Sequence, residues 1–276
     1  MSARDLAAST RTSARRSPVG RVLPIVAVVV TAVFLLAPWS LEAKAHAALH
    51  GLCTQRPSHS LALGDRLLPF DARMTGIYGG FMMAAGWLVA RRRLRSNRPP
   101  PPATMIVLGS FVGAMGVDGL NSLLLDLGHS HPYEPDNRLR LATGLGTGVA
   151  LAVVLAFLLA TTLWRPRREA VPVVGGLPEV GMMVAMQAPF AAIALSGWAP
   201  LYAPVTTLLL VAAVVVVAAL ALVVIVLVKH GDGMFTTPAQ IERPAAIALL
   251  GALLVMAAFA GGRFLLERLT GVPPLT

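Results

Sequence analysis

Long uninterrupted apolar segments constrain this chain more than any other feature of its sequence. Between Leu208 and Val228 no side chain is polar, and about 20 such residues in a helix cross the hydrocarbon core of a bilayer. Only 13% of the 276 residues are charged, against about 25% in soluble domains. The sequence therefore predicts an all-α, polytopic transmembrane helix bundle of about seven spans. These expected spans cover residues 22–40, 74–90, 103–127, 140–164, 180–197, 202–229 and 245–266.

The basic residues indicate how these spans are oriented. The chain has 23 Lys and Arg against 13 Asp and Glu, and the runs RRRLRSNR (91–98) and RPRR (165–168) fall on the side of the N-terminus. Cytoplasmic loops of membrane proteins are enriched in Lys and Arg. We therefore expect an inner (cytoplasmic) membrane protein with its N-terminus inside and its C-terminus outside. Because topology explains the positive charge, we expect no nucleic-acid partner.

The spans divide the chain into three expected parts. Residues 1–21 form a basic cytoplasmic segment, residues 22–164 a four-span core with an outer loop at 41–72, and residues 165–276 a three-span C-terminal extension. The first span leaves one alternative open, because Ala45-His46-Ala47 after an apolar stretch also resembles the cleavage site of a secretory signal.

Asp118 is the residue most suggestive of a functional site. An ionisable residue inside a span is costly, and it marks a functional site or a satisfied structural network. Asn121 and Ser122 share its helix face, and Arg73 and Arg140 begin neighbouring spans at a similar depth. Glycines on all three helices allow close packing. We expect an outward-facing polar pocket, with a structural ion pair as the alternative. The candidate ligand or structural residues are Arg73, Tyr78, Asp118, Asn121, Arg140 and Thr143.

The outer loop holds a second group of chemically active residues. His46, His50 and Cys53 recur there at helical spacing, and imidazole and thiolate are ligands of soft metals. A metal site built from His50, Cys53 and Asp71 is therefore one hypothesis; otherwise we predict no cofactor. Cys53 is the single cysteine, which excludes an intrachain disulfide.

The sequence contains no Walker A loop, no GxSxG elbow and no HExxH motif. We therefore expect a protein without enzymatic activity, either an accessory subunit or a module that handles a small solute or a lipid. Two alternatives remain open: a membrane oxidoreductase or metal-handling protein that uses the outer-loop residues, and a proton-coupled transporter in which Asp118 titrates. The expected partners are membrane lipids, with other membrane subunits or a second copy of the chain as further candidates.

Three segments resemble a known family in their order and spacing. They are LHGLCTQRPSHSLALGDRLLPFDARMTGIYGG (49–80), VDGLNSLLL (117–125) and NRLRLATGLGTG (137–148). They are similar to the bacterial and archaeal membrane proteins grouped as domain of unknown function 2085 (DUF2085), over about residues 45–150. Family members typically carry a histidine and two cysteines where this chain has Thr54, Asp71 and Met74. The resemblance implies a divergent member that kept Arg73, Asp118, Arg140 and Tyr78 but lost or remodelled a thiol site, and it implies no function.

Overall fold

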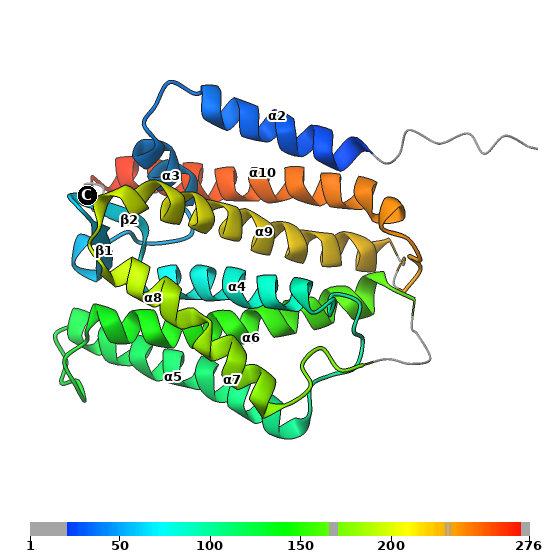
Figure 1. Cartoon of the computed structure of the whole chain (residues 1–276). Helices are drawn as coiled ribbons and strands as arrows, with labels where there is room; N and C mark the ends of the chain where they lie inside the picture. The colour runs from blue at the N-terminus through cyan, green and yellow to red at the C-terminus, as the bar shows by residue number, and fades with distance from the viewer. Residues whose placement is uncertain (1–20, 166–170, 230, 232, 272–276) are drawn as a thin grey trace, which may run out of the picture.

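The structure is a computed structural model, and it describes residues 21–165, 171–229, 231 and 233–271. Figure 1 shows a bundle of long helices that run side by side, with a small hairpin at one end. The predicted all-α class is confirmed. The helices that run along the bundle are α2 (Val22–Leu36), α4 (Ala72–Ala90), α5 (Pro102–Asp126), α6 (Asn137–Leu163), the two short consecutive helices α7 (Leu177–Ala185) and α8 (Gln187–Leu195), α9 (Tyr202–Val228) and α10 (Pro238–Thr270).

Within the described residues, five helical segments are long and apolar enough to cross a membrane. They are α5, α6, the combined segment Leu177–Leu195, the segment Ala199–Val228 that contains α9, and α10. Helix α2 has 15 residues, which is shorter than a typical span. Helix α4 has 19 residues, but Arg73 and several glycines lower its hydropathy. The structure thus supports a multi-pass membrane protein with five candidate spans.

The two ends of the bundle are built differently. One of them, which we call the α3 end, carries α3 (Leu41–Leu49) and the antiparallel hairpin of β1 (Ser60–Leu63) and β2 (Arg66–Asp71). In this hairpin Ala62 pairs with Leu67. Helices α4, α6 and α9 begin at this end, and α5, α8 and α10 finish there (Figure 1). The loop between α5 and α6 therefore also lies at the α3 end.

The closest helix pair is formed by α4 and α6. A Cβ atom added to Gly80 of α4 would lie 2.6 Å from the carbonyl oxygen of Leu145, and one added to Gly148 of α6 would lie 2.6 Å from the backbone nitrogen of Phe81. No side chain fits at such distances, so glycine is what lets the two backbones touch. This pair forms the centre of the bundle and fixes the relative position of Arg73 and Arg140 at its α3 end.

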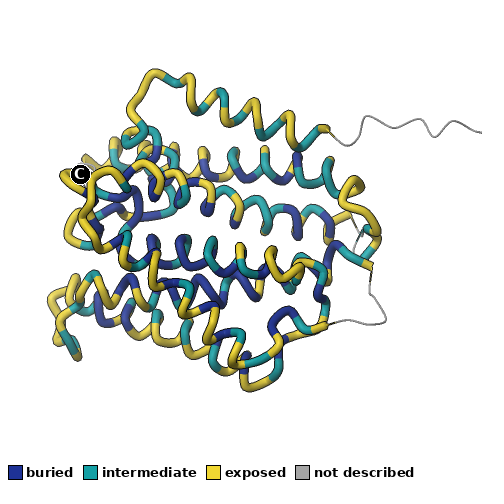
Figure 2. Tube along the Cα trace, in the orientation of Figure 1, coloured by how far each residue is buried: buried dark blue, intermediate teal, exposed yellow. Residues whose placement is uncertain are grey.

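Helices α2 and α5 lie at the edges of the bundle. Helix α2 has no buried residue, and Figure 2 shows it as exposed or partly exposed along its length. Only 17% of the most apolar stretch of α5 is buried, against 61% for α6. The buried residues of α5 nevertheless include Asp118, Asn121 and Ser122, so these three polar groups lie on its inward face.

Candidate functional site

The polar residues of the α3 end are positioned by the first turns of α4 and α6 and the last turns of α5. Strand β2 ends at Asp71, whose Oδ1 accepts a hydrogen bond from the backbone N–H of Met74 at 2.7 Å. This interaction is an N-cap, and it fixes where α4 begins. Arg73 consequently lies in the first turn of α4, and Arg140 lies in the first turn of α6. Both arginines are therefore next to the end of α5, which supplies Asp118.

The carboxylate of Asp118 is enclosed and satisfied by donors. Its Oδ2 accepts from Nη2 of Arg73 at 2.5 Å and from Nε at 3.2 Å. Its Oδ1 accepts from the hydroxyl of Tyr133 at 3.0 Å. The residue is only 1% exposed, whereas the side chain of Arg73 is 20% exposed. The Arg73–Asp118 pair is thus buried from one side and reaches solvent through the arginine.

Arg140 joins the same cluster through Ser122. Both Nη2 of Arg73, at 3.2 Å, and Nε of Arg140, at 3.4 Å, donate to the hydroxyl oxygen of Ser122. Nη1 of Arg140 donates to Oδ1 of Asn137 at 2.8 Å. Arg140 is 4% exposed, and within the described residues no carboxylate forms an ion pair with it. The cluster therefore contains two guanidinium groups and one carboxylate.

The loop between α5 and α6, residues 127–136, covers this cluster through Tyr133. The amide of Asn121 holds the backbone of Tyr133 on both sides: Nδ2 donates to its carbonyl oxygen at 2.8 Å, and Oδ1 accepts from its N–H at 3.4 Å. Burial and the hydrogen bond to Asp118 raise the pKa of the Tyr133 hydroxyl. The phenol therefore stays protonated and donates, so the loop is latched onto the carboxylate.

The structure brings four of the six predicted cluster residues together and separates the other two. Arg73, Asp118, Asn121 and Arg140 share the cluster described above. Tyr78 stacks instead on Phe70, with ring centroids 4.7 Å apart. The Thr143 hydroxyl donates to the carbonyl oxygens of Leu139 and Arg140 on its own helix. The candidate set drawn from the sequence left out Tyr133 and Asn137, and it left out Ser122 although that residue was expected on the same helix face as Asp118.

The outer-loop residues form a separate group around Cys53. Its thiol lies 3.5 Å from Oδ2 of Asp71, and its sulfur accepts the backbone N–H groups of Gln55 and Asp71, both at 3.4 Å. Burial and the negative charge of Asp71 raise the pKa of this thiol to about 11. Because the thiolate is the form that binds metals, a metal ion bound here would have to displace the thiol proton.

Both ring nitrogens of His50 have partners other than Cys53. Its Nδ1 lies 3.0 Å from Oε1 of Gln55, and its Nε2 lies 2.9 Å from Oε2 of Glu267. The described residues contain no group of three or more His, Cys, Asp or Glu side chains arranged to hold a metal. The metal site at His50, Cys53 and Asp71 therefore stays an untested hypothesis.

Arg263, near the end of α10, ties the C-terminal part of the chain to this loop. Its Nη1 donates to the carbonyl oxygens of His50, at 2.7 Å, and of Cys53, and its Nη2 donates to that of Thr54 at 3.1 Å. Its Nε also bonds Glu267 at 2.8 Å. A single guanidinium thus fixes the backbone of residues 50–54, a role that the spacing of residues did not indicate.

Comparison with known proteins identifies one family. Residues 53–154 match the model of the DUF2085 family, whose description is "Predicted membrane protein". This match confirms, over residues 53–154, the resemblance found in the sequence. The match includes Cys53, Arg73, Asp118 and Arg140, and it ends within α6. No curated protein and no solved structure matches the chain.

Proposed function

We propose that this protein is a multi-pass module of the inner membrane that handles a small solute or a lipid carrying an anionic group, at an outward-facing site formed by Arg73, Asp118 and Arg140. The observation that carries this proposal is the unequal charge of the cluster, in which two guanidinium groups meet at Ser122 but only that of Arg73 pairs with the one carboxylate, Asp118. An anion bound here would compensate the positive charge of Arg140, which Asp118 does not neutralise. The module acts by binding, without covalent chemistry.

The electrostatic argument rests on Arg140. A buried charge is costly unless an opposite charge and hydrogen bonds compensate it. The acceptors around Arg140 are the neutral oxygens of Ser122 and Asn137, so the nearest negative charge of the cluster is already held by Arg73. Guanidinium groups bind phosphate and carboxylate groups through paired hydrogen bonds. A phosphate or carboxylate is therefore the ligand chemistry that fits the pair Arg73 and Arg140.

The loop over the cluster suggests how an anion enters. The hydroxyl of Tyr133 donates a hydrogen bond to Oδ1 of Asp118, and Tyr133 thereby covers the cluster at the α3 end. When residues 127–136 lift, the hydrogen bonds of Tyr133 to Asp118 and Asn121 break, and the face of the guanidinium groups is uncovered. In this proposal the loop is closed over the site as it stands, and Tyr133 is the latch.

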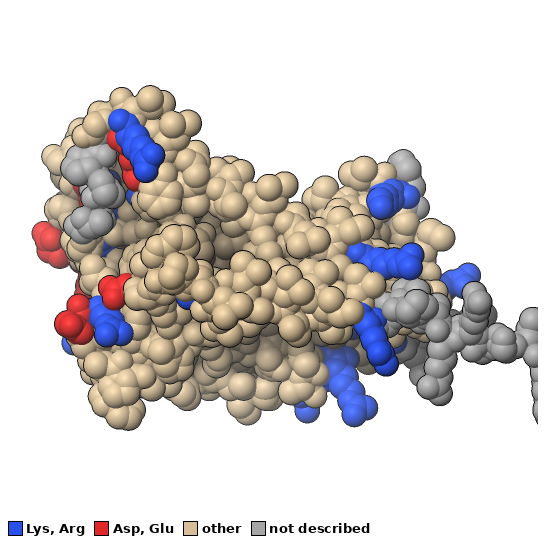
Figure 3. Space-filling view, turned by 90° about the horizontal axis from the view of Figure 1, so that it is seen from above, with Lys and Arg blue, Asp and Glu red and all other residues tan. Residues whose placement is uncertain are grey.

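Charge at the two ends supports the proposed orientation. Among the described residues, the α3 end carries eight basic and eight acidic side chains, whereas the opposite end carries nine basic and two acidic ones. Figure 3 shows the acidic side chains gathered at one end of the visible face. Because positively charged loops of membrane proteins tend to lie inside, this difference supports an α3 end that faces outward. The proposed topology has α2 and α4 crossing as well, which gives seven passes, N-in and C-out. The opposite-end residues are Arg21, Arg91, Arg92, Arg93, Arg95, Arg98, Arg165, Lys229, Arg243, Glu179 and Glu242.

Calorimetric titration with inorganic phosphate, on protein reconstituted in phosphatidylcholine nanodiscs, tests this proposal. We expect saturable binding by the wild type, tighter or faster binding by Tyr133→Phe, and at least about tenfold weaker binding by Arg140→Gln. Arg138→Gln is the matched control, because Arg138 is exposed on the same turn of α6. A second titration with phosphatidylglycerol separates a lipid headgroup from a free anion. Equal binding by the Arg140 and Arg138 variants would contradict the proposal.

An accessory subunit is the second candidate function, because α2 has no buried residue and its apolar surface is therefore uncovered. A partner helix in the membrane would cover such a face, and it would copurify in stoichiometric amount. In that case the cluster at Asp118 would join helices and bind no anion, so phosphate binding and partner copurification distinguish the two candidates.

A further inference from the structure

The end of the bundle opposite the α3 end carries arginines that have no acidic partner. Among the described residues there, Glu179 forms an ion pair with Arg93, whose Nη2 lies 3.7 Å from its Oε2. No carboxylate of the described residues forms an ion pair with Arg91, Arg92 or Arg95. Figure 3 shows Lys and Arg side chains at the end of the visible face that lacks acidic ones. These three guanidinium groups are therefore open to an external anion.

The loop that carries these arginines is held in place by the segment that leads into α7. Nη1 of Arg93 donates a hydrogen bond to the carbonyl oxygen of Pro172 at 3.2 Å. The backbone N–H of Val173 donates to the carbonyl oxygen of Arg98 at 3.1 Å. Residues 91–98 are thus fixed against a second segment of the chain, and a site built on them is ordered before any ligand binds.

Two tryptophans hold guanidinium groups near one level of the bundle. Cζ of Arg95 lies 3.9 Å from the ring centroid of Trp164, and Cζ of Arg91 lies 5.6 Å from that of Trp87. Trp164 directly follows α6, which is a candidate span, and tryptophan is enriched at membrane interfaces. A guanidinium stacked on a ring keeps its edge free, and that edge carries the N–H donors that match a phosphate. Arg95 is therefore placed at the height of the lipid headgroups.

We infer that Arg91, Arg92 and Arg95 form a binding site for the headgroup phosphate of an anionic phospholipid, in the leaflet at this end of the bundle. Arginine clusters next to the cytoplasmic end of a span attract anionic lipids. The neighbouring apolar side chains fit the rest of such a lipid, because Val89 is 54% and Leu94 is 42% exposed. A nucleic acid offers phosphates without acyl chains and would leave these apolar side chains in water, so a lipid is the partner that fits.

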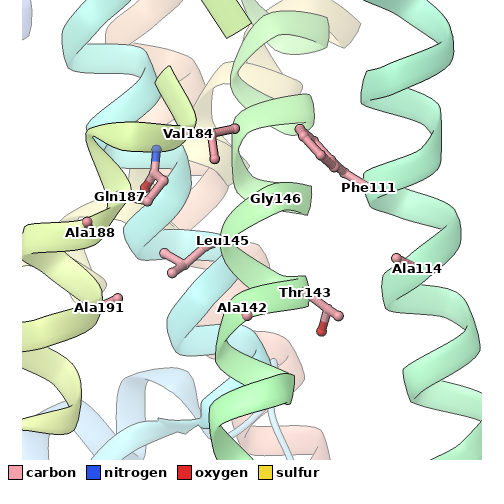
Figure 4. A pocket seen from close by; sticks show the side chains of 10 residues that line it. All are labelled: Phe111, Ala114, Ala142, Thr143, Leu145, Gly146, Val184, Gln187, Ala188 and Ala191. Atoms are coloured by element: carbon pink, nitrogen blue, oxygen red, sulfur yellow. The ribbon is translucent and has the colours of Figure 1, made fainter. Parts of the chain in front are cut away.

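This headgroup site is separate from the other places discussed for a ligand. The proposed anion site at Arg73, Asp118 and Arg140 lies at the α3 end. Figure 4 shows an apolar cleft of about 430 Å³ between α5, α6, α7 and α8, and no side chain that lines it is charged. An anionic headgroup therefore finds no counter-charge in that cleft.

Positive charge at this end also orients the chain in the membrane, and that role depends on charge alone. Recognition of a phosphate depends in addition on the paired N–H donors of a guanidinium group, which lysine lacks. Replacing arginine by lysine therefore keeps the orientation and removes the proposed recognition.

A lipid titration followed by native mass spectrometry tests this inference. Full-length protein, depleted of lipid in a mild detergent, is titrated separately with phosphatidylglycerol and with phosphatidylcholine of the same acyl chains. We expect tighter binding of phosphatidylglycerol by the wild type. The triple variant Arg91→Lys, Arg92→Lys, Arg95→Lys keeps every charge, and it should bind phosphatidylglycerol at least about tenfold more weakly, which is the effect of a lost pair of charge-assisted hydrogen bonds.

A second triple variant is the matched control. Arg66→Lys, Arg138→Lys, Arg268→Lys makes the same change at three exposed arginines of the α3 end, and it should bind phosphatidylglycerol like the wild type. The loss in the first triple variant should be the same with and without Arg140→Gln, so this inference and the proposed function fail separately. Size-exclusion profiles confirm that each variant is folded. Equal binding of the two lipids by the wild type, wild-type affinity in the first triple variant, or an equal loss in the control would overturn the inference.

Discussion

Replacing Asp118 with alanine tests the buried cluster most sharply. The change removes the acceptor of Arg73 at 2.5 Å and of Tyr133 at 3.0 Å, and it leaves both arginines of the cluster without a carboxylate. Breaking a buried ion pair by removing one partner typically costs about 3–5 kcal/mol. Because the Arg73 side chain is 20% exposed, water screens part of its charge, and we expect the lower end of that range, about 3 kcal/mol.

Unfolding by sodium dodecyl sulfate in mixed micelles, followed by tryptophan fluorescence, measures this loss. The double variant Arg73→Met, Asp118→Ala should lose less than the sum of the two single variants, by about 1–3 kcal/mol. Asp126→Ala is the matched control: Asp126 pairs with Arg56, and their side chains are 27% and 40% exposed, so we expect at most about 1 kcal/mol. A similar small loss for Asp118→Ala, or strict additivity of the double variant, would refute the reasoning.

Three further predictions concern packing, ionisation and the C-terminal clamp. Gly148→Val drives a side chain into Ile77 and Phe81 of α4 and should cost at least about 2 kcal/mol in the same titration, while Gly113→Val, where an added Cβ meets nothing within 4 Å, should be tolerated. The pKa of Cys53 is about 11 in the folded protein, against the usual 9.0, so folding favours the neutral thiol. The stability that the neutral thiol contributes is present below about pH 9 and is lost as the pH rises towards 11. Alkylation of Cys53 should therefore accelerate only in alkaline solution, and Asp71→Asn, which keeps the N-cap but removes the charge, should move that midpoint to lower pH; an unmoved midpoint would exclude Asp71 as a cause. Arg263→Gln should speed hydrogen exchange at residues 50–54 relative to the exposed control Arg268→Gln, and equal exchange would mean that the three carbonyl contacts of Arg263 do not hold the loop.

The predictable part of this structure follows from the cost of polar groups in a membrane. A carboxylate within an apolar span must find donors, and the arginines at the starts of the neighbouring spans were within its reach. The glycines of α4 and α6 likewise predicted a close helix pair, because a position without a side chain is where two backbones can meet. The helix bundle and the pairing of Arg73 with Asp118 could therefore be predicted from the sequence pattern and from the position of each residue along its span.

The remaining contacts depend on segments that no periodic pattern relates. Tyr133 lies in a loop, so nothing in its spacing pointed to Asp118. Tyr78 and Thr143 sit on the helices expected to form the site, but Tyr78 stacks on Phe70, and the Thr143 hydroxyl bonds the carbonyl oxygens of its own helix, as threonines in helices commonly do. The stacking of Arg95 on Trp164 likewise joins a loop to the end of α6, and no spacing in the sequence pointed to it.

Native mass spectrometry of the protein, extracted from its own membrane in mild detergent, tests the proposed function most directly. Our account predicts a protein that retains a phosphate- or carboxylate-bearing adduct, and it predicts that Arg140→Gln loses this adduct while Arg138→Gln keeps it. The same adducts in both variants, or stoichiometric partner chains without any anion, would contradict the account and favour an accessory subunit.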